Sequence, residues 1–177
     1  YIADGHHRFQ TSVLYHRECV EKGWTPGAEE SFDKRMIALF NMESPGLRIL
    51  ATHRAVRNVP EPVRREFLDK ARKHFTVSEI DSLDRLEKEM ASEVRSFGLV
   101  TGKKPEFHLL VLKEGAVDDP GFMPGVDGAV RGLGVTILHE AILAGMLGIG
   151  KEMVTSGEYV DYFRGSANLV ENIKSGA

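Results

Sequence analysis

The chain has 177 residues, which suits one ordinary domain and is marginal for two. Its 42% hydrophobic and 28% charged residues exclude a disordered chain, and its net charge of -3 gives no general attraction to nucleic acid or anionic lipid. No apolar run approaches the roughly 20 residues of a membrane-spanning helix, and the single cysteine, Cys19, excludes an internal disulfide and a Cys-based structural zinc site. We therefore expect a cytoplasmic protein with one domain over residues 1–177, in which residues 115–134 are the place for any subdivision.

The two ends of the sequence suggest that it is an internal piece of a longer protein. The chain starts at Tyr1 without an initiator methionine or a signal-peptide pattern, and residues 1–5 are typical of a buried strand that runs into a tight turn. Residues 170–177 are typical of a helix end followed by glycine. An active site could therefore be incomplete in this sequence.

The first part of the chain predicts a helix followed by a strand hairpin. Residues 8–22 are amphipathic and precede Gly23, so we expect a helix that stops at this glycine. Residues 36–40 form a short continuous apolar run, which is typical of a strand covered on both faces. A turn at residues 44–46 then leads into a second strand at residues 47–56, and so short a connection favours an antiparallel hairpin.

The rest of the chain alternates between helical and strand patterns around one long irregular stretch at residues 118–134. The mixture predicts an α+β fold with a mixed sheet, an antiparallel hairpin and packed helices. The helices are expected at residues 60–74, 83–97 (ended by Gly98), 135–147 and 167–174, and the strands at residues 75–80, 107–112 and 159–163.

The densest candidate chemistry is the segment Asp4-Gly5-His6-His7-Arg8, where the expected first strand ends and the first helix begins. The first amides of a helix are unpaired and carry partial positive charge. Glycine lets a ligand approach the backbone, and the histidines and arginine add donors. The segment therefore predicts an anion site, most plausibly for the phosphate of a nucleotide or a phosphorylated metabolite.

The role of Asp4 stays open, since its carboxylate would repel a phosphate. It could cap the helix, hold Mg²⁺, or accept a proton from a substrate hydroxyl. The plainer alternative is that Asp4 only caps the helix while His6, His7 and Arg8 are solvated residues of its first turn.

The histidines do not predict a metal site. His6 and His7 are adjacent and point in different directions at a helix start, and no third ligand follows at metal-binding spacing. His139-Glu140 resembles the start of the HExxH zinc motif, but the position of its second histidine is Leu143.

A second polar segment, Thr52-His53-Arg54, falls late in the second predicted strand. It could complete a phosphate pocket if this strand lies beside the one that ends at Asp4. Strand alternation sends Thr52 and Arg54 to one face and His53 to the other, so all three cannot serve one site equally. A solvated strand face with one buried histidine is the alternative.

Four segments of this chain resemble, in order, the prokaryotic family called domain of unknown function 1015. The segments are residues 2–8, 39–47, 52–54 and 137–140. The resemblance covers essentially the whole chain and implies a protein that is longer at both ends, but it implies no activity.

A shorter similarity links the first segment to the ParB/sulfiredoxin superfamily, in which a Gly-x-His-Arg turn binds nucleotide phosphates. This resemblance implies that Gly5, His7 and Arg8 contact phosphate and that Asp4 matches the aspartate of the free-serine kinases in that superfamily. His6 stands where sulfiredoxin has its reactive cysteine, which excludes reductase chemistry. The catalytic glutamate of the kinases would lie before the first residue of this sequence.

The resulting prediction is a small-molecule phosphotransferase that uses ATP or ADP with Mg²⁺. Its acceptor would be a small hydroxylated metabolite, and neither a membrane nor a nucleic acid is expected as a partner. The alternative is a nucleotide-binding regulatory module without turnover. The predicted catalytic residues are Asp4 and His7, and the predicted phosphate- or nucleotide-binding residues are Gly5, His6, His7, Arg8, Thr52, His53 and Arg54.

Overall fold

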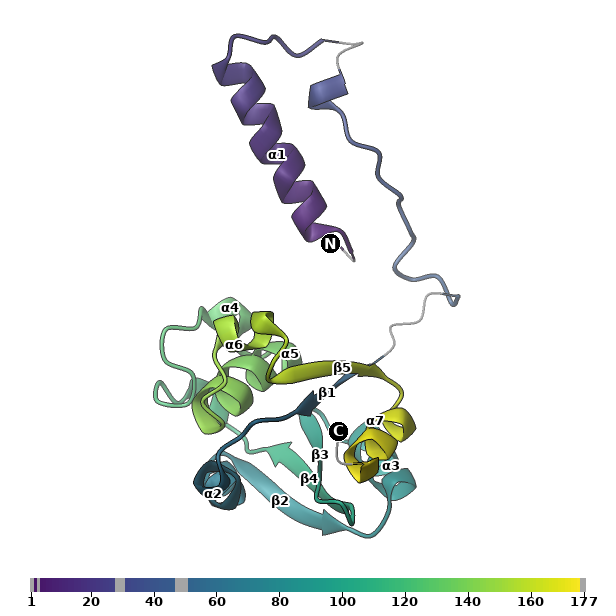
Figure 1. Cartoon of the computed structure of the whole chain (residues 1–177), viewed down its shortest axis with the longest axis vertical. Helices are drawn as coiled ribbons and strands as arrows, with labels where there is room; N and C mark the ends of the chain where they lie inside the picture. Colours follow the sequence, from purple (N-terminus) through teal and green to yellow (C-terminus); the bar gives the residue numbers. More distant parts are fainter. Residues whose placement is uncertain (1, 3, 28–30, 47–50, 176–177) are drawn as a thin grey trace. The chain divides into compact units, whose positions relative to one another are not determined.

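The computed structural model describes residues 2, 4–27, 31–46 and 51–175 (Figure 1). The chain forms two compact units, Tyr1–Ile49 and Leu50–Ala177. Of the strand predicted at residues 1–5, positions 1 and 3 lie outside the described residues, and residues 2, 4 and 5 are not in a strand. Residues 47–50 of the strand predicted at 47–56 also lie outside the described residues. Residues 115–134 lie within the second unit, and the single-domain organisation stays a prediction.

The first unit contains the predicted first helix, α1 (His6–Glu21). It ends as expected at Gly23, whose φ of 85° is in the left-handed region that favours glycine. The amide of Gly23 donates to the carbonyl of Val20, and the amide of Trp24 donates to that of Cys19, both at 2.9 Å. These two bonds form a Schellman motif, which satisfies carbonyls that the helix end leaves free.

A small aromatic cluster ties α1 to the one-turn helix η1 (Ser31–Asp33). The ring of Phe32 stacks on His16 at 5.8 Å between centroids and meets Trp24 edge-on at 5.5 Å. Phe32 and Cys19 are the buried hydrophobic residues among the described part of this unit. The first unit therefore has only a small core.

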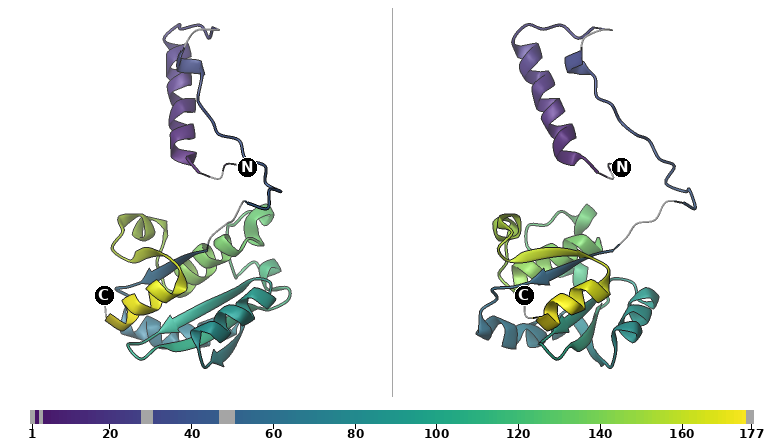
Figure 2. Two further views of the ribbon diagram at one scale, coloured as in Figure 1. Left: turned by 90° about the vertical axis from the view of Figure 1, so that its right-hand side faces the viewer. Right: turned by 45° about the vertical axis from the view of Figure 1, so that its right-hand side comes forward.

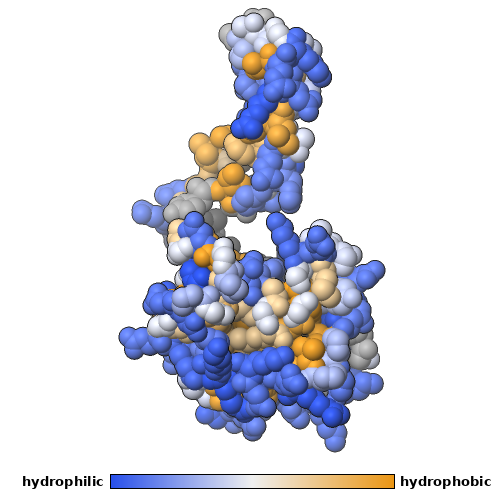
Figure 3. All heavy atoms as spheres, turned by 90° about the vertical axis from the view of Figure 1, so that its left-hand side faces the viewer, coloured by the Kyte–Doolittle hydropathy of each residue, from blue (hydrophilic) through white to orange (hydrophobic). Residues whose placement is uncertain are grey.

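The hairpin predicted in residues 36–56 is wrong. Residues 36–40 form no strand, and their side chains are exposed, with Met36 at 95% and Leu39 at 87%. Apolar side chains accordingly show on the surface of this unit (Figure 3). The second predicted strand does form, as β1 (Thr52–Val56), but it pairs with β5 (Val160–Arg164). An apolar run favours a strand only where another strand can accept its hydrogen bonds, and local sequence does not say which strand that is.

The second unit carries two antiparallel sheets, which confirms the α+β class. One is the two-stranded ribbon of β1 and β5. The other has the order β2-β4-β3, made of β2 (Phe75–Ile80), β4 (Glu106–Leu112) and β3 (Ser96–Thr101). The helical segments of this unit are α2 (Glu61–Arg72), α3 (Leu83–Ser92), η2 (Ala116–Asp118), α4 (Gly128–Arg131), α5 (Gly134–Thr136), η3 (Ile137–Met146), α6 (Lys151–Ser156) and α7 (Ser166–Ser175).

The predicted helix at residues 83–97 is too long. It ends at Ser92, and the chain turns through Arg95, at φ 58°, into strand β3. Gly98 lies inside β3 rather than at a helix end. A Cβ atom added to Gly98 would stand 2.7 Å from Sδ of Met90, so this glycine allows β3 to pack closely against α3.

The three-stranded sheet is covered on both faces (Figures 1 and 2). Because side chains alternate along β4, Leu109 packs with α3 on one face while Leu110 joins α2 and η3 on the other. The larger core cluster contains Phe67, Ala71, Phe75, Leu110, Phe122, Met123, Ile137, Ala141, Ile142 and Met146. A third cluster, built on Leu143, Ile149 and Val160, joins η3 to the β1–β5 ribbon.

The segment η3 lies between these clusters and is a π-helix, a form with hydrogen bonds from residue i+5 to residue i. The amide of Leu147 extends this pattern by donating to the carbonyl of Ile142 at 3.1 Å. The helix predicted at residues 135–147 is thus present, in α5 and η3, but most of it has the wider π geometry. π-Helices are rare, and the single-turn π-bulges in which they mostly occur are frequent at functional sites.

Candidate functional site

The start of α1 offers backbone donors, as the sequence predicts. Gly5 is the N-cap residue and has a left-handed conformation with φ 82°, and α1 has no side-chain cap and no acidic residue in its first turn. The carbonyl of Gly5 accepts the first helical hydrogen bond, from the amide of Phe9 at 2.9 Å. Asp4 therefore does not cap the helix, which removes one of the three roles left open for it.

Arg8 folds back over this turn. Its Nη2 lies 3.2 Å from Oδ2 of Asp4, and a Cβ atom added to Gly5 would also stand 3.2 Å from Nη2. The guanidinium therefore rests against the helix start, where glycine leaves room for it. Both partners of the ion pair are exposed, with side-chain exposure of 68% for Arg8 and 92% for Asp4. Exposed ion pairs contribute little stability, so an incoming anion would compete with Asp4 at small cost.

His6 and His7 occupy the first two positions of α1 and have exposed side chains. Among the residues that the structure describes, no group of three or more His, Cys, Asp or Glu side chains could hold a metal ion. Asp4 is the carboxylate at this turn, and Mg²⁺ in nucleotide-using proteins is commonly held by one or two carboxylates together with substrate phosphates. The donor set is compatible with a magnesium ion that arrives with a nucleotide.

The second predicted segment lies on β1, where the expected alternation holds. Thr52 and Arg54 share a face with Val56, while His53 lies on the other face. Val56 and its partner on β5, Val160, pack against Leu143 of η3. Arg54 therefore points to the η3 side of the ribbon, and His53 does not join it.

Arg54 has few protein partners. Its Nη1 donates to the carbonyl of Thr52, and its Cζ lies 5.5 Å from the ring centroid of Tyr162, the residue opposite it on β5. Its Nε is buried and has no hydrogen-bond partner. Among the described residues, the other buried side-chain nitrogen or oxygen without a hydrogen-bond partner is Nδ1 of His108, on β4.

The positive charge of Arg54 influences the pKa of His139, which lies on η3. Burial lowers the pKa of the His139 imidazole, the positive charge of Arg54 lowers it further, and the carboxylate of Glu140 acts in the opposite direction. His139 also lines a hollow of about 490 Å³, together with Thr136, Glu140 and residues of the loop before α4. The structure thus adds His139 and Tyr162 to the predicted residue Arg54.

A larger hollow of about 750 Å³ lies between α2, η3 and residues 121–126. Its floor includes His74, whose ring packs on Phe122 at 4.4 Å between centroids and whose Nδ1 lies 3.8 Å from Oδ2 of Asp119. Burial lowers the pKa of His74, and the positive charge of Lys73 adds to this effect. Sequence reasoning missed His74, because a single histidine at a helix end carries no pattern of its own.

The structure therefore brings the predicted residues together in two sets, Asp4 with Gly5 and Arg8, and Thr52 with Arg54. That the two sets form one pocket stays a prediction. His139 was noticed in the sequence only as part of an incomplete zinc motif. No sequence pattern points to Tyr162, because it meets Arg54 only through the pairing of two strands that are more than one hundred residues apart in the chain.

The chain is an α+β protein with a donor-rich helix start in one unit and a sparsely partnered arginine in the other. It belongs to the family described as Protein of unknown function (DUF1015), whose model matches residues 1–136. No curated protein and no solved structure matches the chain. In the described ranges, no helix has the length and apolar character needed to cross a lipid bilayer. The similarity to the ParB/sulfiredoxin superfamily stays a prediction.

Proposed function

We propose that the turn formed by residues 4–8 binds the phosphate of a nucleotide, and that the protein transfers phosphate from ATP or ADP to the hydroxyl of a small metabolite. The observation that supports this function best is the start of α1. Its first amides have no side-chain cap, and the guanidinium of Arg8 lies against the same turn in the space that Gly5 leaves. Unsatisfied amides and a helix dipole favour a bound anion.

The side chains at this turn suit phosphoryl transfer, which depends mainly on positioning and on charge neutralisation. Arg8 can grip a phosphate with two parallel hydrogen bonds, and His6 and His7 add donors at the same end of α1. Asp4, released from its ion pair with Arg8 when phosphate binds, would accept the proton of the acceptor hydroxyl or would hold Mg²⁺. In the second unit, Thr52 and Arg54 share one face of β1 and stay proposed phosphate-binding residues, and His53, on the other face, stays a separate prediction.

Titration calorimetry on the full chain tests the binding step, with ATP, ADP and inorganic phosphate in the presence of Mg²⁺. We expect a nucleotide to bind, and we expect Arg8→Ala to weaken binding at least tenfold, which is about 1.4 kcal/mol. Arg17→Ala is the matched control, because Arg17 is an exposed arginine in the middle of the same helix. Absence of binding, or equal binding by Arg8→Ala, would contradict the proposal.

Phosphorus NMR with a panel of small hydroxylated metabolites then tests the transfer step. A new phosphate ester that requires both the nucleotide and the protein supports the phosphotransferase, and we expect Asp4→Asn and His7→Gln to form it more slowly. Nucleotide binding without any ester across the panel would instead support the regulatory module.

A further inference from the structure

We propose that Arg54, Tyr162 and His139 form an oxyanion site in the second unit, which holds the phosphate or carboxylate group of a small molecule. The proposal shares Arg54 with the function proposed above and adds two residues and a ligand class to it. It concerns the second unit alone, so it stands even if the turn at the start of α1 binds nothing.

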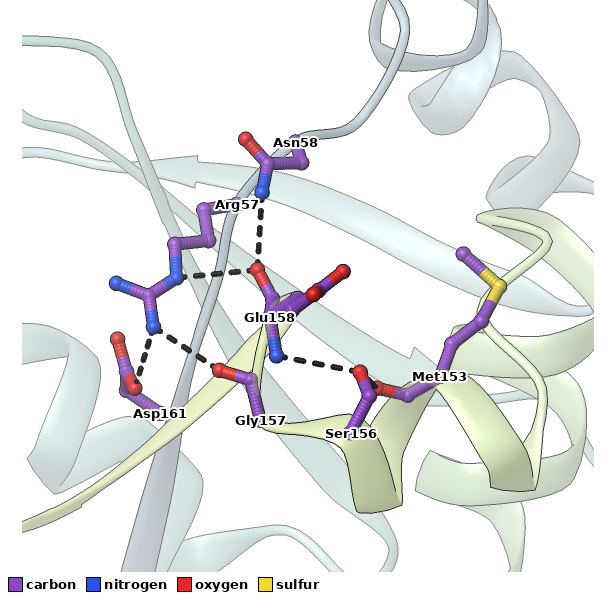
Figure 4. Close-up of polar contacts among 7 residues, drawn as sticks. All are labelled: Arg57, Asn58, Met153, Ser156, Gly157, Glu158 and Asp161. Carbon is purple, nitrogen blue, oxygen red and sulfur yellow. Dashed lines mark hydrogen bonds and ion pairs between the residues drawn. The ribbon is translucent and has the colours of Figure 1, made fainter.

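The first argument is a comparison of arginines in the same unit. Arg57, just after β1, donates to the carbonyls of Gly157 and Glu158 and to the carboxylate of Asp161, at 2.9–3.2 Å (Figure 4). Arg131 donates to four backbone carbonyls. Both guanidiniums are therefore used to hold the fold together. Arg54 has one carbonyl acceptor, and no ion pair with an acid is found for it in the described residues.

The second argument is the buried Nε of Arg54. A buried donor without a partner costs about 1–3 kcal/mol, and native structures contain few of them. Such a group calls for an explanation, and a role in binding an ion is one. An oxyanion that accepted hydrogen bonds from Nε and a neighbouring Nη in parallel would satisfy this donor, in the geometry by which arginine recognises carboxylates and phosphates.

The third argument is the rigidity of the surroundings. Arg54 and Tyr162 are directly opposite each other on paired strands, and the ring lies within cation–π distance of the guanidinium. The ring therefore favours a position of the guanidinium beside it. Sites built on strands hold their side chains more firmly than sites built on loops.

His139 supplies the third member of the set. It lies on the π-helix η3, and the charge of Arg54 and its own burial both favour its neutral form. A neutral imidazole still donates one N–H, and we include His139 in the proposed site as a second donor. The carboxylate of Glu140, the next residue, has the opposite effect and favours the protonated form of His139. His139 also lines the hollow of about 490 Å³, whose other lining residues come from the loop before α4, from α4 and α5, and from Glu140.

NMR titration of the full chain tests this site, with sodium phosphate in one arm and sodium acetate in the other at constant ionic strength. The Nε–H signal of Arg54 is assigned by its loss in Arg54→Gln, and the ring signals of His139 by their loss in His139→Gln. We expect one or both anions to shift both sets of signals along a single saturating curve. The arm with the tighter binding identifies the ligand group as a phosphate or a carboxylate.

Variants separate this site from the other arginines of the second unit. We expect Arg54→Lys, which keeps the charge but loses the planar pair of donors, to weaken binding about tenfold. Arg57→Gln removes a nearby arginine that already has partners and should keep the binding. The proposal is overturned if neither anion gives saturating shifts at Arg54 and His139, or if Arg54→Lys binds the anion as tightly as the parent chain does.

Discussion

His74 and His139 are two histidines whose surroundings make protonation costly. His74 is 9% exposed, its ring packs on Phe122, and Lys73 and Lys113 oppose a further positive charge while Asp119 favours one. Burial likewise lowers the pKa of His139, and the charge of Arg54 adds to this effect. Both imidazoles are therefore more readily protonated in the unfolded chain than in the folded one.

The free energy of unfolding is expected to fall as the solution becomes acidic. The unfolded chain binds more protons once the pH drops below about 6.5, the ordinary histidine pKa, so these groups give their full stability only above that value. The loss continues until the pH passes below the lowered pKa values of the folded state. Urea unfolding between pH 8 and pH 5 measures this dependence.

His74→Phe should reduce the dependence, because phenylalanine keeps the contact with Phe122 and cannot be protonated. His6→Gln is the control, since His6 is exposed at the start of α1. An unchanged pH dependence in His74→Phe would show that other groups are responsible.

Single residues also show what the sequence could and could not predict about the site. Gly5 and Arg8 were found because a glycine before a helix and a basic residue in its first turn are local patterns, and the structure places them together. Arg54 was found as part of a polar run, but its surroundings were not. Its neighbours Tyr162 and His139 come from β5 and η3, and only the tertiary fold brings these elements to β1.

At the scale of elements, α4 organises the loop that borders both hollows. Arg131, its last residue, donates to the carbonyls of Val117, Asp119, Met123 and Val126 at 2.6–3.4 Å. In a helix or strand, these carbonyls would accept hydrogen bonds from backbone amides. In this loop the half-buried guanidinium of Arg131 supplies the donors instead. A long loop with two prolines could be predicted from the sequence, but the side chain that holds it could not.

Arg131→Met should destabilise the second unit by about 3 kcal/mol or more, because several buried carbonyls lose a charged donor. Arg131→Lys should recover little of this loss, since an ammonium cannot reach acceptors spread around a planar guanidinium. Urea unfolding measures both variants. Arg85→Met is the control, because Arg85 is an exposed arginine that only pairs with Asp81 and Glu89. Equal losses in Arg131→Met and Arg85→Met would contradict the role given to Arg131.

Elements with strong local signals were predicted well, and those that depend on a distant partner were not. The amphipathic helix α2 and the strands β2 and β4 lie within two residues of their predicted bounds. β3 was missed because Phe97 continues the apolar spacing of α3, so the pattern does not mark the turn between them. Local sequence likewise predicts a helix at η3 but not its π geometry.

At the scale of the whole molecule, the buried hydrophobic residues are divided unequally between the two units. The three core clusters all belong to the second unit, whereas the described part of the first unit buries Cys19 and Phe32. Burial of apolar surface is the main favourable term in folding. The second unit therefore has the means to fold without the first.

We expect residues 50–177, produced alone, to unfold in one cooperative transition in urea, as single domains with a continuous core do. Residues 1–49 alone should show at most weak helical signal, because a helix of the length of α1 is marginal in water without tertiary packing. Circular dichroism during urea titration measures both fragments. A broad, non-cooperative transition for residues 50–177 would show that this core needs the first unit. A cooperative one would allow the anion titration to be repeated on this fragment, in which Arg54 is present and Arg8 is not.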